Sequence, residues 1–272
     1  MGKIDDIQAY KEWTEYHRSL KRDKAADNLS PVERKKKLEK LEANVIEWIL
    51  FFFSEFAKYP FTKFHKKAIK RITTNMEWYE VLSWSRELAK STIVFMCMMY
   101  LVLTGKKKNV LLISNSHENA VRLLEPYKKA FESNSMLKAY YGDLREFGSW
   151  TADEFTLTTG ATFRAIGALE SPRGTRKDAV RPDTALVDDF DTDADCRNPD
   201  ILKKKWEWFE EALFPTRSIS EDLLVIFCGN LIALDCCVKR AGDKADHWDI
   251  VNIRDKDGKS SWPEKNTEER IN

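Results

Sequence analysis

The sequence lacks several features that would set it apart from ordinary folded proteins. Its 272 residues carry a net charge of only +1, so no global basic character indicates a nucleic-acid-binding protein. The most apolar stretch, Val45 to Phe53, is short and contains Glu47, so it falls well under the ~18 residues of a membrane span. The polar, charged N-terminus has no signal-peptide pattern. We therefore expect a folded protein with an ordinary core and no membrane partner.

Cysteine is scarce and is not arranged for metal binding. The five cysteines form no pair with the spacing of a metal site, and an odd number suggests reduced thiols in a cytoplasm. Positive charge is local instead, in short lysine runs at 35–37, 66–67, 106–108 and 203–205. Most runs of this kind form solvated faces, and a smaller share contact nucleic acid.

Turn and periodicity patterns predict an α/β protein. Ser30-Pro31-Val32-Glu33 is a helix start, with serine as cap, proline in the first turn and Glu33 closing a capping box. The apolar spacing that follows predicts one helix ending at Tyr59-Pro60. Beyond it, strands are expected at 79–84, 109–114, 184–187, 223–228 and 250–253, a hairpin at 155–165, and helices at 61–73, 91–104, 116–131 and 199–213. This alternation predicts a mainly parallel sheet flanked by helices. We expect three parts: an N-terminal helical segment at 1–58, a core at 59–242, and a small lid or linker region at 243–272.

The segment after the first predicted strand has the layout of a phosphate-binding loop: a strand, a tight loop ending in Lys-Ser/Thr, and then a helix. The usual pattern is Gly-x4-Gly-Lys-Ser/Thr, and here Trp84 and Ala89 stand at the two glycine positions. Lys90 would neutralise the outer phosphates and the hydroxyl of Ser91 would hold Mg²⁺. The expected nucleotide-binding residues are Ser85, Arg86, Glu87, Leu88, Ala89, Lys90, Ser91 and Thr92, the last also a helix-start residue. The alternative is a buried strand followed by a helix with a surface lysine.

A second signal lies downstream, where a short apolar run at 184–187 ends in Asp188-Asp189. Hydrolases with a phosphate-binding loop need a carboxylate at such a strand end for Mg²⁺ and a neighbouring acid to orient the attacking water. Asp188 is the candidate metal ligand, and Asp189 is the favoured water-orienting acid with Asp191 as the other candidate. The alternative is an acidic turn. Together the two signals predict ATP and Mg²⁺ as ligands.

Four blocks in this order resemble the ATPase domain of the large terminase subunit of tailed bacteriophages. The blocks are 84–92, 167–176, 181–189 and 226–230, and the resemblance covers roughly residues 59–272. That family commonly carries an arginine in the loop, and often alanine or glycine before the lysine, so the missing glycines are expected. The resemblance implies a P-loop NTPase of the ASCE/RecA-like class.

The resemblance also implies roles for individual residues. Arg86 would contact the γ-phosphate and stabilise the transition state, although a salt bridge with Glu87 or with the acidic cluster is the alternative. Asp189 stands where the family usually has glutamate. Gly229 and Asn230 resemble the coupling motif that senses the γ-phosphate, with an ordinary strand-end turn as the alternative. Arg173 and Arg176 would contact DNA or a neighbouring subunit's nucleotide, although a loop with solvated arginines is the alternative.

Two further features of the resemblance concern the base and the end of the chain. Tyr59-Pro60-Phe61 and His65 resemble the region that embraces the adenine, with an aromatic core patch as the alternative. Trp262-Pro263-Glu264-Lys265 resembles the segment that leads out of the ATPase domain.

Taken as a whole, the resemblance implies a packaging motor that hydrolyses Mg-ATP to translocate double-stranded DNA into a procapsid. Its partners would be DNA, the portal and procapsid, and the small terminase subunit, in a homo-oligomeric ring in the host cytoplasm. No spaced carboxylate set of the family's nuclease domain is present, so no nuclease activity is expected. Two alternatives stay open: a helicase-like nucleic-acid-dependent ATPase, and a non-hydrolysing nucleotide-binding assembly module.

Overall fold

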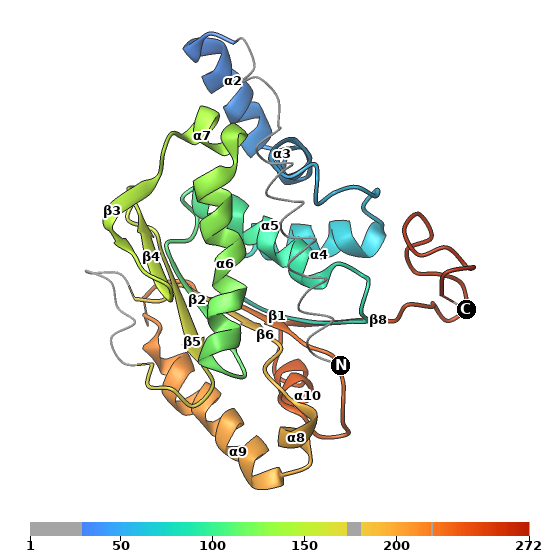
Figure 1. The fold of residues 1–272 in the computed structure, drawn as a ribbon. Coiled ribbons are helices and arrows are strands. Elements are labelled where there is room, and N and C mark those ends of the chain that lie inside the picture. Colours follow the sequence, from blue (N-terminus) through green and yellow to red (C-terminus); the bar gives the residue numbers. More distant parts are fainter. Residues whose placement is uncertain (1–28, 173–180, 219, 272) are drawn as a thin grey trace.

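The computed structural model describes residues 29–172, 181–218 and 220–271. Its centre is an eight-stranded sheet in the order β3-β4-β5-β2-β6-β7-β1-β8 (Figure 1). The strands are β1 (Trp78–Trp84), β2 (Asn109–Ser114), β3 (Arg145–Trp150), β4 (Glu154–Leu157), β5 (Thr162–Gly167), β6 (Thr184–Asp188), β7 (Leu224–Cys228) and β8 (His247–Val251). All neighbours pair in parallel except β3 with β4 and β4 with β5. The predicted class, a mainly parallel sheet flanked by helices, is confirmed, and β7 separates β1 from β6 as in an ASCE-type sheet.

Helices cover both faces of the sheet because its central strands are apolar on both sides. One face carries α3 (Val45–Phe52), α4 (Lys63–Thr74), α5 (Lys90–Leu103) and α6 (His117–Ser133), with α2 (Pro31–Glu42) and α7 (Ser135–Tyr141) at one end (Figure 1). The other face carries α9 (Pro199–Glu207) and α10 (Cys237–Gly242), with α8 (Asp193–Cys196) beside them. A π-helical turn (Trp208–Leu213) and a 3-10 turn (Phe214–Thr216) follow α9. Alternate strand residues face the two layers: Leu112 and Leu186 point to the first, Leu111 and Val187 to the second.

The N-terminal helix was predicted as one element, and that prediction is wrong. Ser30 and Glu33 do form the expected capping box at the start of α2. The helix ends at Glu42, however, and the Asn44 side chain accepts hydrogen bonds from the backbone N–H groups of Ile46 and Glu47, which starts α3 as a new helix. An asparagine in extended conformation is a favoured helix cap, so it interrupts the run although the apolar spacing continues through it.

Segments near both ends of the described chain are joined to the rest of the fold. Trp48 of α3 is fully buried, and its indole donates to the hydroxyl of Tyr141 at 2.8 Å. β8, which lies inside 243–272, pairs in parallel with β1 from Glu80–His247 to Trp84–Val251. The division of the chain at 58 and 242 stays a prediction. No described helix has the length and apolarity needed to cross a membrane.

Candidate functional site

The loop between β1 and α5 adopts the conformation that the missing glycines would favour. Ala89, at the second glycine position, has φ = 59° and lies in the left-handed region, as does Glu87 with φ = 69°. A non-glycine residue there costs roughly 1–2 kcal/mol. The loop therefore keeps a turn suited to glycine, and α5 begins directly after it at Lys90 with its N-terminus facing the loop. Free N–H groups at a helix N-terminus are suited to bind an anion.

The loop and the acidic strand meet at one hydrogen bond. The Ser91 hydroxyl donates to Asp188 Oδ2 at 2.7 Å, although β7 lies between β1 and β6. Asp188 is buried, and its pKa is raised to about 6. Burial is the largest cause and the nearby Asp189 charge adds to it, while Lys90 and the Ser91 hydrogen bond act in the opposite direction. A hydroxyl and a carboxylate are the hard oxygen ligands that Mg²⁺ prefers. A buried carboxylate beside a hydroxyl fits such an ion, which would relieve the cost of burying the charge.

Two cations of the loop are available to a ligand. Lys90 is half-buried and Arg86 is exposed, and within the described part of the chain neither forms an ion pair. Glu87, the acid beside Arg86, pairs instead with Lys265 at 3.0 Å. The site thus presents two cations that form no ion pair in the described part of the chain and that line one cavity, and the charge of Lys90 reaches the buried Asp188.

The two candidate water-orienting acids differ in their surroundings. Asp189 is exposed, has φ = 47°, and lines the cavity at the loop. Asp191 is partly buried, and its Oδ2 accepts a hydrogen bond from the Val238 N–H at 3.0 Å, at the start of α10. Asp189 therefore presents an exposed carboxylate at the cavity. Asp191 uses Oδ2 to hold the start of α10, while its Oδ1 is buried without a hydrogen-bond partner and the residue lines the third cavity described below.

Three adjoining cavities run along this edge of the sheet, with volumes of about 510, 430 and 360 Å³. The first is lined by Tyr59, Ile253 and the loop, the second by the loop with Asp189 and Asn230, and the third by the acidic turn with Gly229 and Asn230. Ser85, Arg86, Glu87 and Lys265 line both the first and the second; Arg86, Asp189 and Asn230 line both the second and the third. Each volume lies in the ~300–1,000 Å³ range of ligand pockets. Because neighbouring cavities share lining residues, the three form one continuous trough along the loop.

Gly229 and Asn230 follow β7 directly. The Gly229 N–H donates to the Leu82 carbonyl at 3.2 Å, and a Cβ added at Gly229 would lie 2.2 Å from Val238 Cγ2. Glycine is needed there because α10 packs against the backbone. Asn230 is half-buried and borders the second and third cavities.

The residues that resemble an adenine-binding region divide between cavity and core. Tyr59 lines the first cavity. His65 is fully buried: Nδ1 lies 3.0 Å from the Thr62 hydroxyl and Nε2 lies 3.0 Å from the Leu88 carbonyl oxygen. Burial lowers its pKa to about 4, so it is a neutral core residue that supports the loop from below. Arg173 and Arg176 lie outside the described residues.

Sequence reasoning missed two lysines that hold the site in place. Lys265 Nζ donates to the Glu87 carbonyl oxygen at 2.8 Å. Lys205 is buried in α9, where its ammonium donates to the Phe190 carbonyl and to Asp195 Oδ2, the latter at 2.8 Å. Lys265 lies in the 262–265 block that resembles the end of the family's ATPase domain, but its contact with the loop depends on tertiary structure. Lys205 lies in the 203–205 lysine run, and such runs usually form solvated faces.

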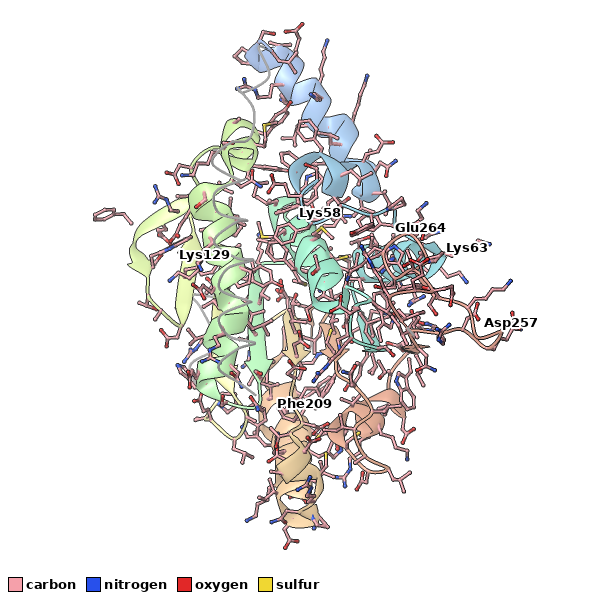
Figure 2. All side chains as sticks on the ribbon, turned by 45° about the vertical axis from the view of Figure 1, so that its right-hand side comes forward. Lys58, Lys63, Lys129, Phe209, Asp257 and Glu264 are labelled. Carbon is pink, nitrogen blue, oxygen red and sulfur yellow. The ribbon has the colours of Figure 1, made fainter. Side chains whose placement is uncertain are left out.

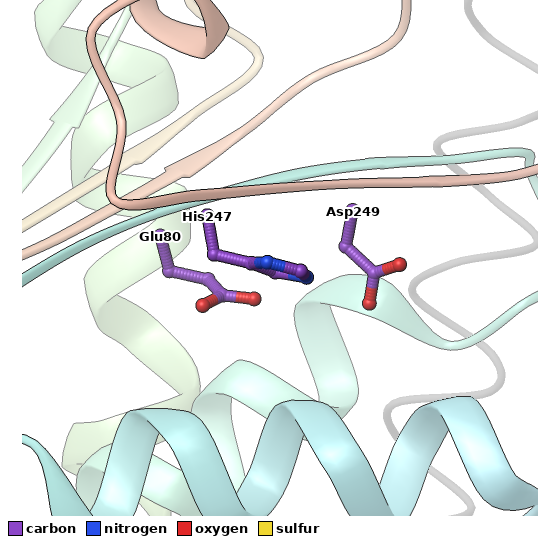
Figure 3. A group of neighbouring side chains, drawn as sticks. All are labelled: Glu80, His247 and Asp249. Carbon is purple, nitrogen blue, oxygen red and sulfur yellow. The ribbon is translucent and has the colours of Figure 1, made fainter.

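A separate acidic group lies across β1 and β8. Glu80, His247 and Asp249 point toward one another on the side of the sheet that faces α4 (Figure 3). Arg71 of α4 already binds both acids, at 2.6 Å from Glu80 Oε1 and 2.8 Å from Asp249 Oδ2. The group is therefore an ion-pair network that fastens α4 to the sheet.

Comparison with known proteins gives distant structural similarity. No protein-family model and no curated protein sequence matches the chain. The HK97 bacteriophage large terminase is similar with a TM-score of 0.49 and 14% identity, over 73% of this chain and 40% of that one. Two structures of the Thermus phage P74-26 large terminase ATPase domain are also similar. The first is of a mutant, with a TM-score of 0.44, 14% identity, and 74% and 84% coverage. The second has a TM-score of 0.40, 16% identity, and 64% and 67% coverage. This chain thus spans 40% of the length of the HK97 protein.

Proposed function

We propose that the chain is the ATPase motor domain of a viral large terminase, which hydrolyses Mg-ATP to translocate double-stranded DNA into a procapsid. The hydrogen bond from Ser91 to buried Asp188 carries the proposal. It brings a phosphate-loop hydroxyl and a strand-end acid together at a place where two unpaired cations face a cavity. A surface lysine and an acidic turn with no shared ligand would not explain this convergence.

Each side chain then has a role that its position supports. Ser91 and Asp188 hold Mg²⁺, which when bound neutralises charge on the phosphoryl group. Lys90 neutralises the outer phosphates, and Arg86 reaches the γ-phosphate across the cavity that both residues line. Asp189 orients the attacking water. Roles of this kind stabilise charge that develops in the transition state, which is the main term in phosphoryl transfer.

Coupling to DNA is assigned to the strand end beside the third cavity. Asn230 borders the cavities on both sides of Asp189, so its amide can respond to loss of the γ-phosphate. The portal, the small terminase subunit and a ring of identical subunits complete the proposed motor, with Arg173 and Arg176 as contacts to DNA or to a neighbouring nucleotide.

The test is Mg-ATP hydrolysis by the full chain over a range of protein concentrations, with and without double-stranded DNA. Lys90→Ala is the test variant, and Lys259→Ala, an exposed lysine away from the loop, is its control. We expect turnover that Lys90→Ala abolishes and that rises with DNA or concentration. Absence of nucleotide binding in the unaltered chain would reject the proposal.

A second candidate function is a non-hydrolysing nucleotide-binding assembly module. The observation that favours it is Asp189, which is one methylene shorter than the glutamate its position would suit. Asp189→Glu distinguishes the two. A motor with a slow water-orienting acid gains turnover in this variant, whereas a binding module binds Mg-ATP and turns over nothing in either form.

A further inference from the structure

The outer face of α4 consists of four lysines followed by a threonine. Its exposed positions are Lys63, Lys66, Lys67 and Lys70, at the i, i+3, i+4, i+7 spacing of one helix face, and then Thr74 at the end of the helix. The opposite face, with His65, Ala68, Ile69, Ile72 and Thr73, is buried in the core. Lys106 lies beyond the end of the helix, but its Nζ is engaged there, 3.5 Å from the Thr73 carbonyl oxygen and 3.4 Å from the Tyr100 hydroxyl. Figure 2 shows Lys63 projecting outward at the edge of the molecule.

The four exposed lysines of α4 have no acid on their own helix, unlike the lysines of α2, α6 and α9. Some exposed lysines of those helices, such as Lys35 and Lys204, also form no ion pair within the described residues. Four helical cations elsewhere pair with an acid at i,i+4: Glu118–Arg122, Glu125–Lys129, Lys203–Glu207 and Lys239–Asp243. α4 contains no acid, and none of its four exposed lysines forms an ion pair within the described residues. Its remaining cation, Arg71, turns inward to Glu80. The nearest acid of the C-terminal segment is Glu264, whose charge reaches His65 at the start of the helix.

This arrangement works against the helix that carries it. Like charges at i,i+3 and i,i+4 repel, and cations in the first turn oppose the helix dipole. The four lysines are exposed and form no ion pair within the described residues, so no attraction there offsets the repulsion between them. Local rules of stability are broken in this way chiefly at functional sites.

The composition of the face identifies the class of partner. Protein interfaces are depleted in lysine and enriched in aromatic residues and arginine. Binders of single-stranded nucleic acid use exposed aromatic side chains on which the bases stack. The lysine face offers none, because the partly exposed Phe64 of α4 packs against Trp84 with ring centroids 4.9 Å apart. Lysine is a flexible point charge suited to phosphate without regard to sequence. The face extends about 10 Å along the helix axis from Lys63 to Lys70, a length that spans several phosphates of a duplex.

We propose that the lysine face of α4 binds the phosphate backbone of double-stranded DNA without sequence specificity. The choice of DNA rests on the proposed motor function. The face is also mechanically close to the nucleotide site, because His65 on the buried side of α4 contacts the Leu88 carbonyl of the phosphate loop. A force that bound DNA exerts on the lysines would thus reach the loop through α4.

The experiment compares two variants of the full chain that lose the same charge. The test variant is Lys63→Gln/Lys66→Gln/Lys67→Gln/Lys70→Gln, and glutamine keeps helix propensity close to that of lysine. The control is Lys203→Gln/Lys204→Gln/Lys239→Gln/Lys244→Gln, which removes exposed lysines on the other face of the sheet. Binding of a short labelled duplex is measured over a range of salt concentrations, and basal ATP hydrolysis is measured without DNA.

We expect the slope of log K against log salt to fall by about 3–4 in the test variant, since each phosphate contact contributes about 0.9. The control should keep the slope, and both variants should keep basal hydrolysis. An unchanged slope in the test variant, or an equal loss in the control, overturns the proposal. So does competition by polyglutamate as strong as that by DNA, which would favour an acidic protein, or stronger binding to duplex RNA. A changed slope with no ATP hydrolysis in any form would retain the DNA face and reject the motor function.

Discussion

Lys265 Nζ lies 2.8 Å from the Glu87 carbonyl oxygen and 3.0 Å from its carboxylate, across 178 residues of sequence. Asn266 Nδ2 adds a contact to the same carbonyl oxygen at 3.3 Å. Trp262 fastens the same segment to the start of α4 by donating to the Pro60 carbonyl oxygen at 3.0 Å. The left-handed Glu87 is therefore held by a distant part of the chain, and the C-terminal segment is a structural part of the phosphate loop.

Lys265→Ala should weaken nucleotide binding more than it weakens the fold. The Lys265–Glu87 pair is largely exposed, so its loss should cost about 0.2–1 kcal/mol of unfolding free energy. Loss of the loop contacts should weaken Mg-ATP binding roughly 3- to 10-fold, the size of one hydrogen bond. Calorimetric titration and thermal unfolding measure the two effects. Equal nucleotide affinity in Lys265→Ala and the control Lys259→Ala would show that the loop needs no such support.

Asp188→Asn should stabilise the ligand-free protein at neutral and alkaline pH while abolishing hydrolysis. The pKa of Asp188 is raised from 3.8 to about 6, so its contribution to stability is present at low pH and lost as pH rises through about 6. Asparagine removes that loss and can still accept the Ser91 hydrogen bond. The gain should reach about 2–3 kcal/mol near pH 8.

The decisive measurement is how the difference in unfolding free energy between Asp188→Asn and the unaltered protein changes with pH. Below pH 4 the two should have nearly the same stability, because Asp188 is then neutral. The pKa of His65 is lowered from its ordinary 6.5 to about 4, so the stability that neutral His65 contributes is lost as pH falls from about 6.5 to about 4. This loss is the same in both proteins and cancels in their difference. A gain that does not depend on pH would contradict the role of the buried charge.

Ala89→Gly should stabilise the chain and leave hydrolysis intact. Ala89 has φ = 59°, and glycine occupies that region without a Cβ penalty, so we expect a gain of about 1 kcal/mol. Ala139→Gly, inside α7, is the matched control and should cost about 1 kcal/mol. Urea unfolding of both variants provides the comparison. A loss in Ala89→Gly would mean that the methyl group contributes packing that outweighs its strain.

Lys205→Met should slow hydrolysis more than it weakens nucleotide binding. The Lys205 ammonium holds the Phe190 carbonyl, directly after Asp189, and pairs with Asp195 at 2.8 Å. Without it the acidic turn loses its anchor and Asp195 loses its partner, at a cost of about 2 kcal/mol or more. We expect kcat to fall at least ~10-fold, about 1.4 kcal/mol of barrier, with a small change in KM.

Two further variants separate the effect of Lys205 on hydrolysis from its effect on stability. Lys204→Met, on the exposed side of the same helix, should behave as the unaltered chain. Lys205→Met/Asp195→Asn should recover stability without recovering kcat, because it removes the unpaired acid but not the loss of the Phe190 contact. Recovery of both would place the effect in stability alone.

The parts of the fold that sequence predicted best are those with local signals. β2 has the predicted bounds, 109–114, because a strand covered on both faces is a continuous apolar run. The hairpin of β4 and β5 was predicted from its Thr159-Gly160 turn. β3 was missed, since Arg145, Glu146 and Phe147 are exposed at the sheet edge and show no alternation.

The site divides in the same way. Lys90 and Ser91 were predicted because they are contiguous, and Asp188 because it ends an apolar strand. The 2.7 Å hydrogen bond between the Ser91 hydroxyl and Asp188 depends on the strand order, which cannot be read from the sequence. Lys265 and Lys205 contribute through contacts with residues far along the chain, and their neighbours in sequence carry no sign of it. The catalytic roles stay predictions until turnover is measured.

The position of β1 in the sheet bears on where movement can occur. β1 pairs with β7 on one side and with β8 on the other, so Leu82 is matched to Cys228 and to Asp249 at once. A loop rooted in such a strand cannot shift without breaking two ladders. The chain after Asn230 has no such restraint, and Leu231 and Leu234 stand exposed there. In the proposed motor, the loop between β1 and α5 would therefore be the fixed part, and the segment that follows β7 would be the part that moves.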